Sequence, residues 1–290
     1  MSRLPDFVII GAMKCGTSSL HEQLAAQPGF FMSDPKEPNF FSDDTNYERG
    51  FDWYRGLFAG AGADALVGES STHYTKLPTY PATVARLKER LPDVRLVYVM
   101  RHPISRLVSQ YIHEWTEGAT SDPIDVAVRR LPRIVDYSRY AMQLTPYFEA
   151  YGTDRVLPVF LERMHRDPQE ELTRVARFLG YGGEVRWRTD LGEQNVSAER
   201  LRVSAWRDAL TDQPVLAWLR RHLVPQGVRD RIKSLWQMKR RPELSAETEA
   251  ELAADLDRDL ATLGDWLGLK LTCATYKDVV LGGRAPNWAD

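Results

Sequence analysis

Short apolar runs alternate with longer amphipathic stretches along the first 180 residues of the chain. The runs are rich in Val, Ile, Leu, Phe or Tyr and are bounded by Gly, Pro or charged residues, which is typical of strands buried on both faces. Four strands are predicted, at residues 7–10, 65–67, 94–100 and 155–160.

The stretches between these runs show helical periodicity and helix start and stop signals. Predicted helices cover residues 17–27, 80–90, 104–117, 138–151 and 168–179. Strands that alternate with helices predict an α/β fold of three layers, with a central parallel sheet between two layers of helices. A long loop is expected between the first helix and the second strand, and long loops are often functional.

The sequence changes character near residue 180 and is mostly helical beyond it. The clearest helix covers residues 246–267, where leucines recur at helical spacing. No repeat, low-complexity tract or Gly/Ser linker separates the two parts. We therefore expect a single domain over residues 1–290, with a nucleotide-binding α/β core in residues 1–180 and a helical extension in residues 181–290.

Composition narrows the function classes. The 290 residues are 43% hydrophobic and 27% charged, which excludes disorder as the main state. The net charge of −2 disfavours a nucleic-acid partner, so an anionic ligand must be bound by local groups. No apolar run has the length of a membrane helix, which predicts a cytoplasmic protein without a membrane partner. Cys15 and Cys273 lack the spacing of metal ligands, so no metal site is expected.

The segment after the first predicted strand carries the strongest chemical signal. Residues 11–19, Gly-Ala-Met-Lys-Cys-Gly-Thr-Ser-Ser, connect a strand that ends at Ile10 to a helix that begins at Thr17. Glycines allow the backbone to approach a ligand closely, and the free N–H groups at a helix start bind anions. The segment is therefore predicted to bind a phosphate group.

This segment differs from the P-loop of nucleoside triphosphatases and kinases at one position. The pattern GxxxxGK[ST] requires lysine where this chain has Thr17, and the lysine present, Lys14, lies three residues earlier. A P-loop kinase of nucleotides or small molecules is thus the alternative enzyme, and it predicts Mg²⁺ dependence. A nucleotide-binding module without catalytic activity is the alternative of another class.

Two segments together resemble the sulfotransferases that use 3′-phosphoadenosine 5′-phosphosulfate (PAPS). Residues 14–20 resemble the loop that binds the 5′-phosphosulfate. Residues 97–111 resemble the 3′-phosphate motif, a hydrophobic strand followed by R-x-P-x-x-R-x-x-S-x-Y. The resemblance implies a P-loop-like core that binds PAPS, requires no metal and releases 3′-phosphoadenosine 5′-phosphate (PAP).

The resemblance also implies roles for individual residues on the donor side. Arg101 and Ser109 correspond to the ligands of the 3′-phosphate, whereas Arg106 is expected to be exposed or salt-bridged. Lys14 is expected to stabilise negative charge on the leaving oxygen. The loop residues expected to hold the donor are Lys14, Cys15, Gly16, Thr17, Ser18 and Ser19.

A third segment indicates the acceptor side. Residues 36–41, Lys-Glu-Pro-Asn-Phe-Phe, resemble the K-E-x-H-F-F segment of heparan-sulfate-type sulfotransferases, whose glutamate acts as the base. The corresponding residue is Glu37, and burial beside phenylalanines is expected to raise its pKa. His73 is the alternative base, because the ordinary pKa of histidine lies near neutrality.

The segment Gly68–Tyr74 resembles the E-K-[ST]-P-x-Y segment of the same branch, with Ser70 in the place of the lysine. Asn39 likewise replaces the histidine of K-E-x-H-F-F, so we expect different side chains around the acceptor. Glu69 is expected to bind the acceptor, to orient Lys14 or to be structural. Residues 195–197 and 223–225 resemble bacterial members of the superfamily.

These observations predict a sulfotransferase that moves the sulfuryl group of PAPS to a hydroxyl or amine of a small-molecule or carbohydrate-like acceptor. The predicted catalytic residues are Lys14, Glu37 and His73. The sequence does not name the acceptor or the oligomeric state.

Overall fold

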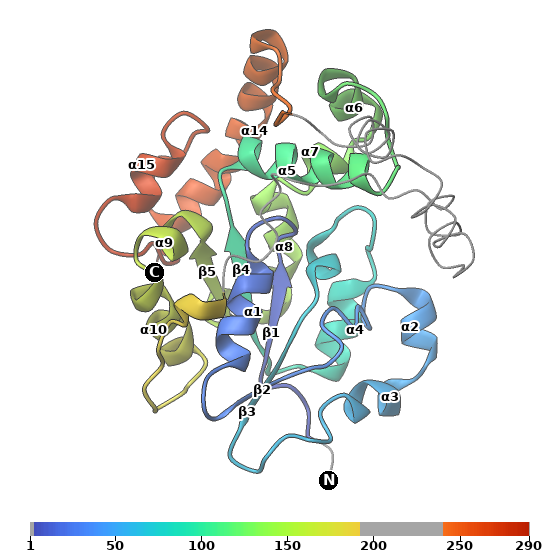
Figure 1. Ribbon diagram of the computed structural model, residues 1–290, viewed down its shortest axis with the longest axis vertical. Helices are drawn as coiled ribbons and strands as arrows, with labels where there is room; N and C mark the ends of the chain where they lie inside the picture. The colour runs from blue at the N-terminus through green and yellow to red at the C-terminus, as the bar shows by residue number, and fades with distance from the viewer. Residues whose placement is uncertain (1–2, 192–239, 290) are drawn as a thin grey trace, which may run out of the picture.

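The computed structural model describes residues 3–191 and 240–289. Its strands form one parallel sheet in the order β2-β3-β1-β4-β5 (Figure 1). The parallel sheet of the predicted α/β fold is therefore confirmed. The strands are β1 (Phe7–Gly11), β2 (Phe30–Met32), β3 (Leu66–Ser70), β4 (Arg95–Met100) and β5 (Val156–Phe160).

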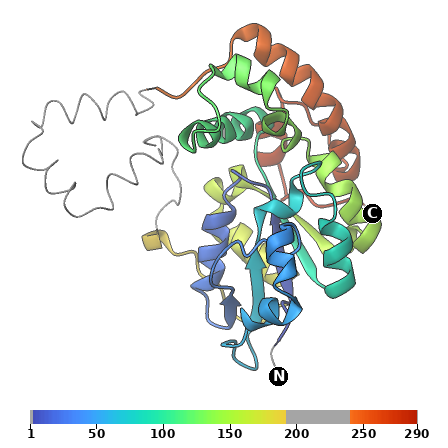
Figure 2. The ribbon, with the colours of Figure 1, turned by 90° about the vertical axis from the view of Figure 1, so that its right-hand side faces the viewer.

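Helices cover both faces of the sheet, which gives the three predicted layers (Figure 2). α1 (Thr17–Ala25) and α10 (Pro168–Phe178) lie on one face, and α4 (Thr83–Arg90) and α8 (Tyr140–Tyr151) lie on the other. The remaining described helices are α2 (Asp44–Glu48), α3 (Phe51–Gly56), η1 (Thr72–Thr75), α5 (Pro103–Thr116), α6 (Ile124–Arg130), α7 (Arg133–Asp136), η2 (Thr153–Arg155), α9 (Leu161–Arg166), η3 (Thr189–Leu191), α14 (Ala246–Leu267) and α15 (Tyr276–Leu281).

The central strands are apolar along their whole length because helices cover them on both sides. Every residue of β1 is buried, and its register pairs Val8 with Leu96 of β4 and with Glu69 of β3. Glu69 is thus a carboxylate inside the core. Because all the strands are parallel, their carboxyl ends meet at one edge of the sheet, where α/β proteins bind ligands.

The segment between α1 and β3 differs from the predicted loop. It contains the edge strand β2 and the short helices α2 and α3. β2 follows Pro28-Gly29 and has only three residues. A run of three residues is too short to show the periodicity of a strand. Asp43 caps α2 by accepting a hydrogen bond from the N–H of Asn46 at 3.0 Å. Residues 33–43 remain without helix or strand, and this part contains Glu37.

Helix α14 has the bounds that the sequence predicts. Ser245 caps its start, Gly268 ends it with a left-handed φ of 64°, and Leu256 and Leu260 are fully buried. The helix packs against α5 and α8, and Asp259 accepts hydrogen bonds from two N–H groups at the start of α8. Residues 195–197 and 223–225 lie outside the described residues, and the division near residue 180 stays a prediction. In the described ranges no helix is both long and apolar enough to cross a membrane.

Candidate active site

The turn between β1 and α1 has the backbone of an anion-binding loop. Lys14 and Gly16 have left-handed φ angles of 69° and 87°, and no side chain caps the start of α1. A side chain at position 16 would also meet Leu161, because an added Cβ would lie 2.6 Å from its Cδ1 atom. The first N–H groups of a helix have no helical acceptor, so those of residues 17–19 are available to an anion.

Cys15 supports this loop from within the core. Its thiol is fully buried and lies 3.7 Å from the hydroxyl of Tyr140, and burial raises its pKa to about 11. Its N–H group donates to the carbonyl of Ala12 at 3.2 Å. The side chain of Cys15 is therefore a packing group of the loop, and its expected place among the donor-binding residues stays a prediction. Lys14, Gly16, Ser18 and Ser19 are half-buried at the surface of the loop.

The second motif lies against the same loop. Arg101 follows β4, and its Nη1 atom donates to the carbonyl oxygen of Lys14 at 3.4 Å. The hydroxyl of Tyr140 donates to the carbonyl of Arg101 at 2.5 Å and fixes the backbone there. Ser109 lies two turns into α5 and is 4% exposed. The fold thus joins two segments that are almost 90 residues apart in sequence.

Arg106 was expected to be exposed or salt-bridged, and the structure places it differently. It is fully buried rather than exposed, and its Nη1 atom donates to the carbonyl of Met13 at 3.5 Å. Its other nitrogens donate to the hydroxyl of Ser138 and the carbonyl of Ile134, both at 2.5 Å. Arginine has five donors in a rigid fork, so one buried side chain can connect the loop to α5 and α7. Arg106 therefore positions the loop.

Arg241 is a basic residue of this region that the sequence analysis missed. Partial burial lowers the pKa of Arg241, and the positive charge of Arg101 lowers it further. Two guanidinium groups thus approach each other next to the loop, which is an arrangement that an anion stabilises. The basic run Lys239-Arg240-Arg241 in a chain of slightly negative net charge is the sequence signal that could have identified it.

Glu37 lies near the carboxyl end of β3, with its N–H group donating to the carbonyl of Ser70 at 2.9 Å. Its carboxylate accepts from Nζ of Lys36 at 2.8 Å and from the hydroxyl of Thr72 at 3.3 Å. Burial raises the pKa of Glu37, but the charge and hydrogen bond of Lys36, together with the charges of Lys76 and His73, outweigh burial and hold the pKa below its ordinary value. The expected rise is thus wrong, and Glu37 is ionised at neutral pH.

His73 lies in η1, and its ring stacks on that of Tyr80 with centroids 4.9 Å apart. Burial, and then the charge of Lys76, lower its pKa to about 4. The expectation of a histidine that titrates near neutrality is therefore wrong. Its buried Nδ1 atom and the Oδ1 atom of Asn39 have no hydrogen-bond partner in the described part of the chain.

Glu69 is the centre of a buried hydrogen-bond cluster. Its carboxylate accepts from the hydroxyls of Tyr54, Tyr74 and Ser71, each at 2.9 Å. The Ser71 hydroxyl in turn accepts from the N–H group of Asn39 at 3.1 Å. Burial raises the pKa of Glu69 to about 7. Glu69 is fully buried, and through Ser71 it supports the segment that carries Glu37, which fits the structural one of its three expected roles.

The hydroxyl of Ser70 is hydrogen-bonded to a second histidine, His21, for which the sequence indicated no partner. Nδ1 of His21, on α1, lies 2.9 Å from the Ser70 hydroxyl. Burial, and then the charge of Lys36, lower the pKa of His21 to about 4. Position 70 is therefore the site of a neutral hydrogen bond.

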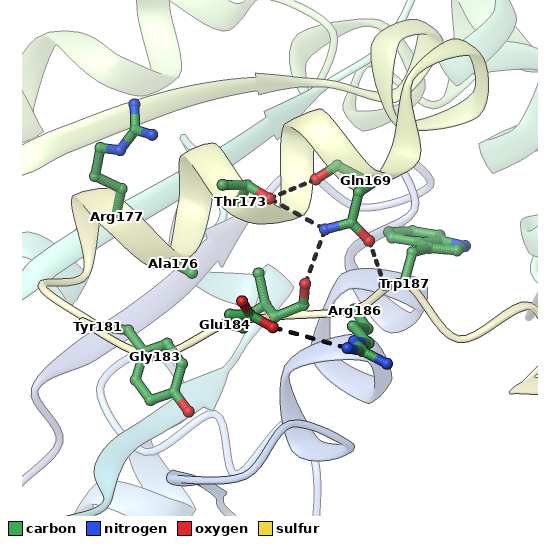
Figure 3. Close-up of a pocket in the computed structure, with 10 residues that line it drawn as sticks. Gln169, Thr173, Ala176, Arg177, Tyr181, Gly183, Glu184, Arg186 and Trp187 are labelled. Carbon is green, nitrogen blue, oxygen red and sulfur yellow. Dashed lines mark hydrogen bonds and ion pairs between the residues drawn. The ribbon is translucent and has the colours of Figure 1, made fainter.

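A surface pocket between α10 and residues 181–187 lies apart from these groups (Figure 3). Gln169 is bonded to its own neighbours there, since its side chain donates to the carbonyl of Val185 at 2.8 Å and accepts from the N–H of Trp187 at 2.9 Å. No predicted site residue lines this pocket. The candidate active site is therefore the edge of the sheet that holds the loop, Arg101 and Glu37.

Fold and site together define a class of protein: an α/β protein whose first strand leads into a turn with the backbone geometry of an anion-binding loop, with a basic group after the neighbouring strand. Comparison with known families agrees with this class. The model of the sulfotransferase domain matches residues 4–203, which is more than half of the chain. This chain belongs to the sulfotransferase family.

Individual relatives support the same assignment. Mouse heparan sulfate glucosamine 3-O-sulfotransferase 3B1 is 29% identical over 187 residues, which cover 61% of this chain and 46% of the relative. Human bifunctional heparan sulfate N-deacetylase/N-sulfotransferase 2 is 27% identical over 199 residues, which cover 61% of this chain and 22% of the relative. The chain thus spans less than half the length of these relatives.

A solved structure shares the fold over almost the whole chain. The sulfotransferase from Alicyclobacillus acidocaldarius superposes with a TM-score of 0.65 at 22% sequence identity, covering 93% of this chain and 98% of that one. The predicted family and fold class are confirmed.

Proposed function

We propose that this protein is an enzyme that transfers the sulfuryl group of PAPS to a hydroxyl or amine of a carbohydrate-like or small-molecule acceptor. One observation carries the proposal: the guanidinium of Arg101 reaches the carbonyl of Lys14 in the loop. Two separated motifs thereby form one basic site, which suits a nucleotide with phosphate groups at two positions. Membership of the sulfotransferase family and the presence of Thr17 in place of a P-loop lysine disfavour the kinase alternative.

On the donor side we assign the phosphosulfate to the loop and the 3′-phosphate to Arg101 and Ser109. The N–H groups of residues 17–19 and the hydroxyls of Ser18 and Ser19 offer donors to the phosphosulfate. Arg101 offers a planar fork that matches phosphate oxygens. Arg241, close to Arg101, is a further candidate for the 3′-phosphate.

In the proposed step, the acceptor oxygen or nitrogen attacks sulfur while the bond from sulfur to the phosphate oxygen breaks. The bonding electron pair stays on that phosphate oxygen, and PAP leaves. Lys14 stabilises the charge that develops there, and the Glu37 carboxylate takes the acceptor proton. The low pKa of Glu37 keeps it in its basic form at neutral pH. We propose that the step needs no metal ion and that neutral His73 orients the acceptor.

Two buried polar atoms support a polar acceptor. Asn39 Oδ1 and His73 Nδ1 lack partners in the described ranges, and both residues belong to segments that contact or neighbour Glu37. Buried polar atoms are normally hydrogen-bonded, so hydroxyl groups of a sugar suit them. The relatives named above are heparan sulfate sulfotransferases, which favours a carbohydrate-type acceptor. A cytoplasmic location stays a prediction.

Ligand-induced thermal stabilisation tests the donor. A ligand that binds only the native state raises the melting temperature. PAP without metal is expected to raise it clearly more than ADP does, and equal or larger stabilisation by Mg-ATP would favour the kinase. If PAP binds but no sulfate transfer occurs across a panel of sugars, phenols and amines, the protein is a nucleotide-binding module.

A further inference from the structure

Lys76 is a buried lysine without an anionic partner in residues 3–191 and 240–289. It follows η1 directly and is 8% exposed. In the part of the chain that the structure describes, its ammonium forms no hydrogen bond and no ion pair; its recorded contact is with the ring of Tyr137, whose centroid lies 5.9 Å from Nζ. This distance is at the limit of about 6 Å for a cation–π interaction. A buried ammonium normally requires acceptors for its three donors.

The backbone holds Lys76 next to the anion-binding loop. The hydroxyl of the preceding residue, Thr75, donates to the carbonyl of Ile10 at the end of β1 at 2.8 Å. The carbonyl of Lys76 accepts from the N–H of Tyr80 at 3.1 Å, and the N–H of Leu77 donates to the side chain of Gln143 at 2.8 Å. These contacts fix the backbone of Lys76 beside the end of β1 and α8, directly after η1, which also carries His73.

Two carboxylates, those of Glu37 and Glu114, act on Lys76 through their charge, but both are already paired with other cations. Glu37 accepts from Nζ of Lys36 at 2.8 Å, and Glu114 accepts from two nitrogens of Arg133 at 3.0 and 2.8 Å. Burial lowers the pKa of Lys76 to about 8, and Glu37 and Glu114 only partly offset this effect. Among the described residues, the buried positive charge of Lys76 therefore has no counterion of its own.

We propose that Lys76 completes an oxyanion site in the active centre and binds the oxygens of the sulfuryl group that is transferred. This inference rests on the proposed function. The sulfuryl group has to pass between the loop and Glu37. The charge of Glu37 acts on Lys76, and the residue before Lys76 is bonded to the strand that leads into the loop. A cation in a site from which water is excluded stabilises a charged transfer group far more than it would in water. Position 70 supplies no such charge, because Ser70 is hydrogen-bonded to His21.

The affinity ratio of PAPS to PAP tests this role, because the two ligands differ by the sulfuryl group alone. Calorimetry on the full chain should show that Lys76→Met reduces the preference for PAPS about tenfold or more, as expected for the loss of a charge-assisted contact. The affinity for PAP should stay within about twofold, since PAP lacks the group that Lys76 binds. Lys76→Arg should retain part of the preference for PAPS.

Lys88 provides a matched control. Its Nζ atom also lies over a tyrosine ring, 4.5 Å from the centroid of Tyr151, but it belongs to α4 and donates to the carbonyl of Pro92. Lys88→Met should leave both affinities unchanged. Lys76→Met removes an unpaired buried charge, so the melting temperature of this variant should not fall below that of the wild-type protein. A lower melting temperature would show that Lys76 has a stabilising counterion.

The sulfuryl group is one of two possible sources of the oxyanion, and an anionic group of the acceptor is the other. A heparan sulfate oligosaccharide serves as the acceptor probe. If Lys76→Met leaves the PAPS preference intact but raises the KM of this probe at least tenfold, the site binds an acceptor anion and the assignment to the sulfuryl group is wrong. If neither quantity changes, the oxyanion site itself is refuted. Failure of the wild-type protein to bind PAP would instead refute the proposed function.

Discussion

The donor side and the acceptor side of the active centre are built in different ways. On the donor side, a strand, a turn and a helix present backbone N–H groups, and Arg106 connects the turn to α5. On the acceptor side, Glu37 lies in a segment without helix or strand, and side chains linked to Glu69 hold that segment. The first design depends on backbone geometry, whereas the second depends on a network of buried polar groups.

This difference determines how the two sides respond to mutation. Backbone N–H groups remain in place when a side chain is replaced, so changes in the donor loop mainly affect the contacts of the replaced group. A buried network is cooperative, and one unsatisfied member costs about 1–3 kcal/mol. We therefore expect losses of donor affinity from single contacts, and losses of turnover from substitutions that touch the Glu37 segment.

The base assignment gives the strongest test of the acceptor side. Glu37→Gln should keep the fold and PAP binding but lower turnover by about 10² or more, the lower end of a general-base contribution. His73→Ala should cost less, because a histidine whose pKa is about 4 is a weak base at neutral pH. Turnover of both variants is measured with the acceptor found in the panel. A nearly active Glu37→Gln variant beside an inactive His73→Ala variant would transfer the role to His73.

On the donor side, Arg101→Ala should weaken PAP binding by about 1.5–3 kcal/mol, the value of a hydrogen bond to a charged group. Lys14→Ala should mainly lower the maximal rate, because its proposed role is in the transition state. Calorimetry with PAP and steady-state kinetics separate the two effects. A Lys14→Ala variant that loses affinity while its maximal rate is preserved would show that Lys14 binds the donor in the ground state.

The strand, turn and helix of the proposed donor side were predictable because their signals are local. The glycines of the loop, the strand before it and the helix after it follow one another in the chain, and Arg101 directly follows an apolar strand. The parallel sheet was predictable for the same reason. β2 was missed because three residues at a sheet edge leave no periodic pattern.

The acceptor side was less predictable because its properties come from distant partners. The motif identified Glu37 as the candidate base, but it did not indicate that the pKa of Glu37 would be lowered. A half-buried lysine such as Lys36 can point to solvent or to Glu37, and the sequence does not show which. Nothing near Glu69 in the sequence indicates that Tyr54 donates to it. Arg106 was expected to be exposed or salt-bridged, because a charged helical residue usually lies at the surface, yet it is buried and donates to Met13, Ile134 and Ser138.

Two substitutions separate the stability of the Glu69 cluster from its effect on the active centre. Ser71→Ala and Tyr54→Phe each remove one hydrogen bond of 2.9 Å to Glu69, but only Ser71 also accepts from the N–H group of Asn39. Both variants should lose about 1–3 kcal/mol of unfolding free energy. Turnover of Ser71→Ala should fall several-fold further than that of Tyr54→Phe, with PAP affinity unchanged in both. Equal turnover would show that the cluster stabilises the core without positioning the Glu37 segment.

The hydrogen bond from Thr72 to Glu37 should have a small effect on the pH dependence of the reaction. At 3.3 Å to both carboxylate oxygens it is long, and it favours the ionised form of Glu37. Thr72→Val keeps the volume but removes the donor, so the pKa of Glu37 should rise by less than about one unit, since a net hydrogen bond is worth about 1 kcal/mol. In the wild-type protein the acid limb of kcat/KM is expected below the ordinary pKa of glutamate, and in Thr72→Val it should move to higher pH. Thr72→Ser retains the hydroxyl and should keep the wild-type profile, whereas an acid limb that stays in place in Thr72→Val would mean that another group titrates there.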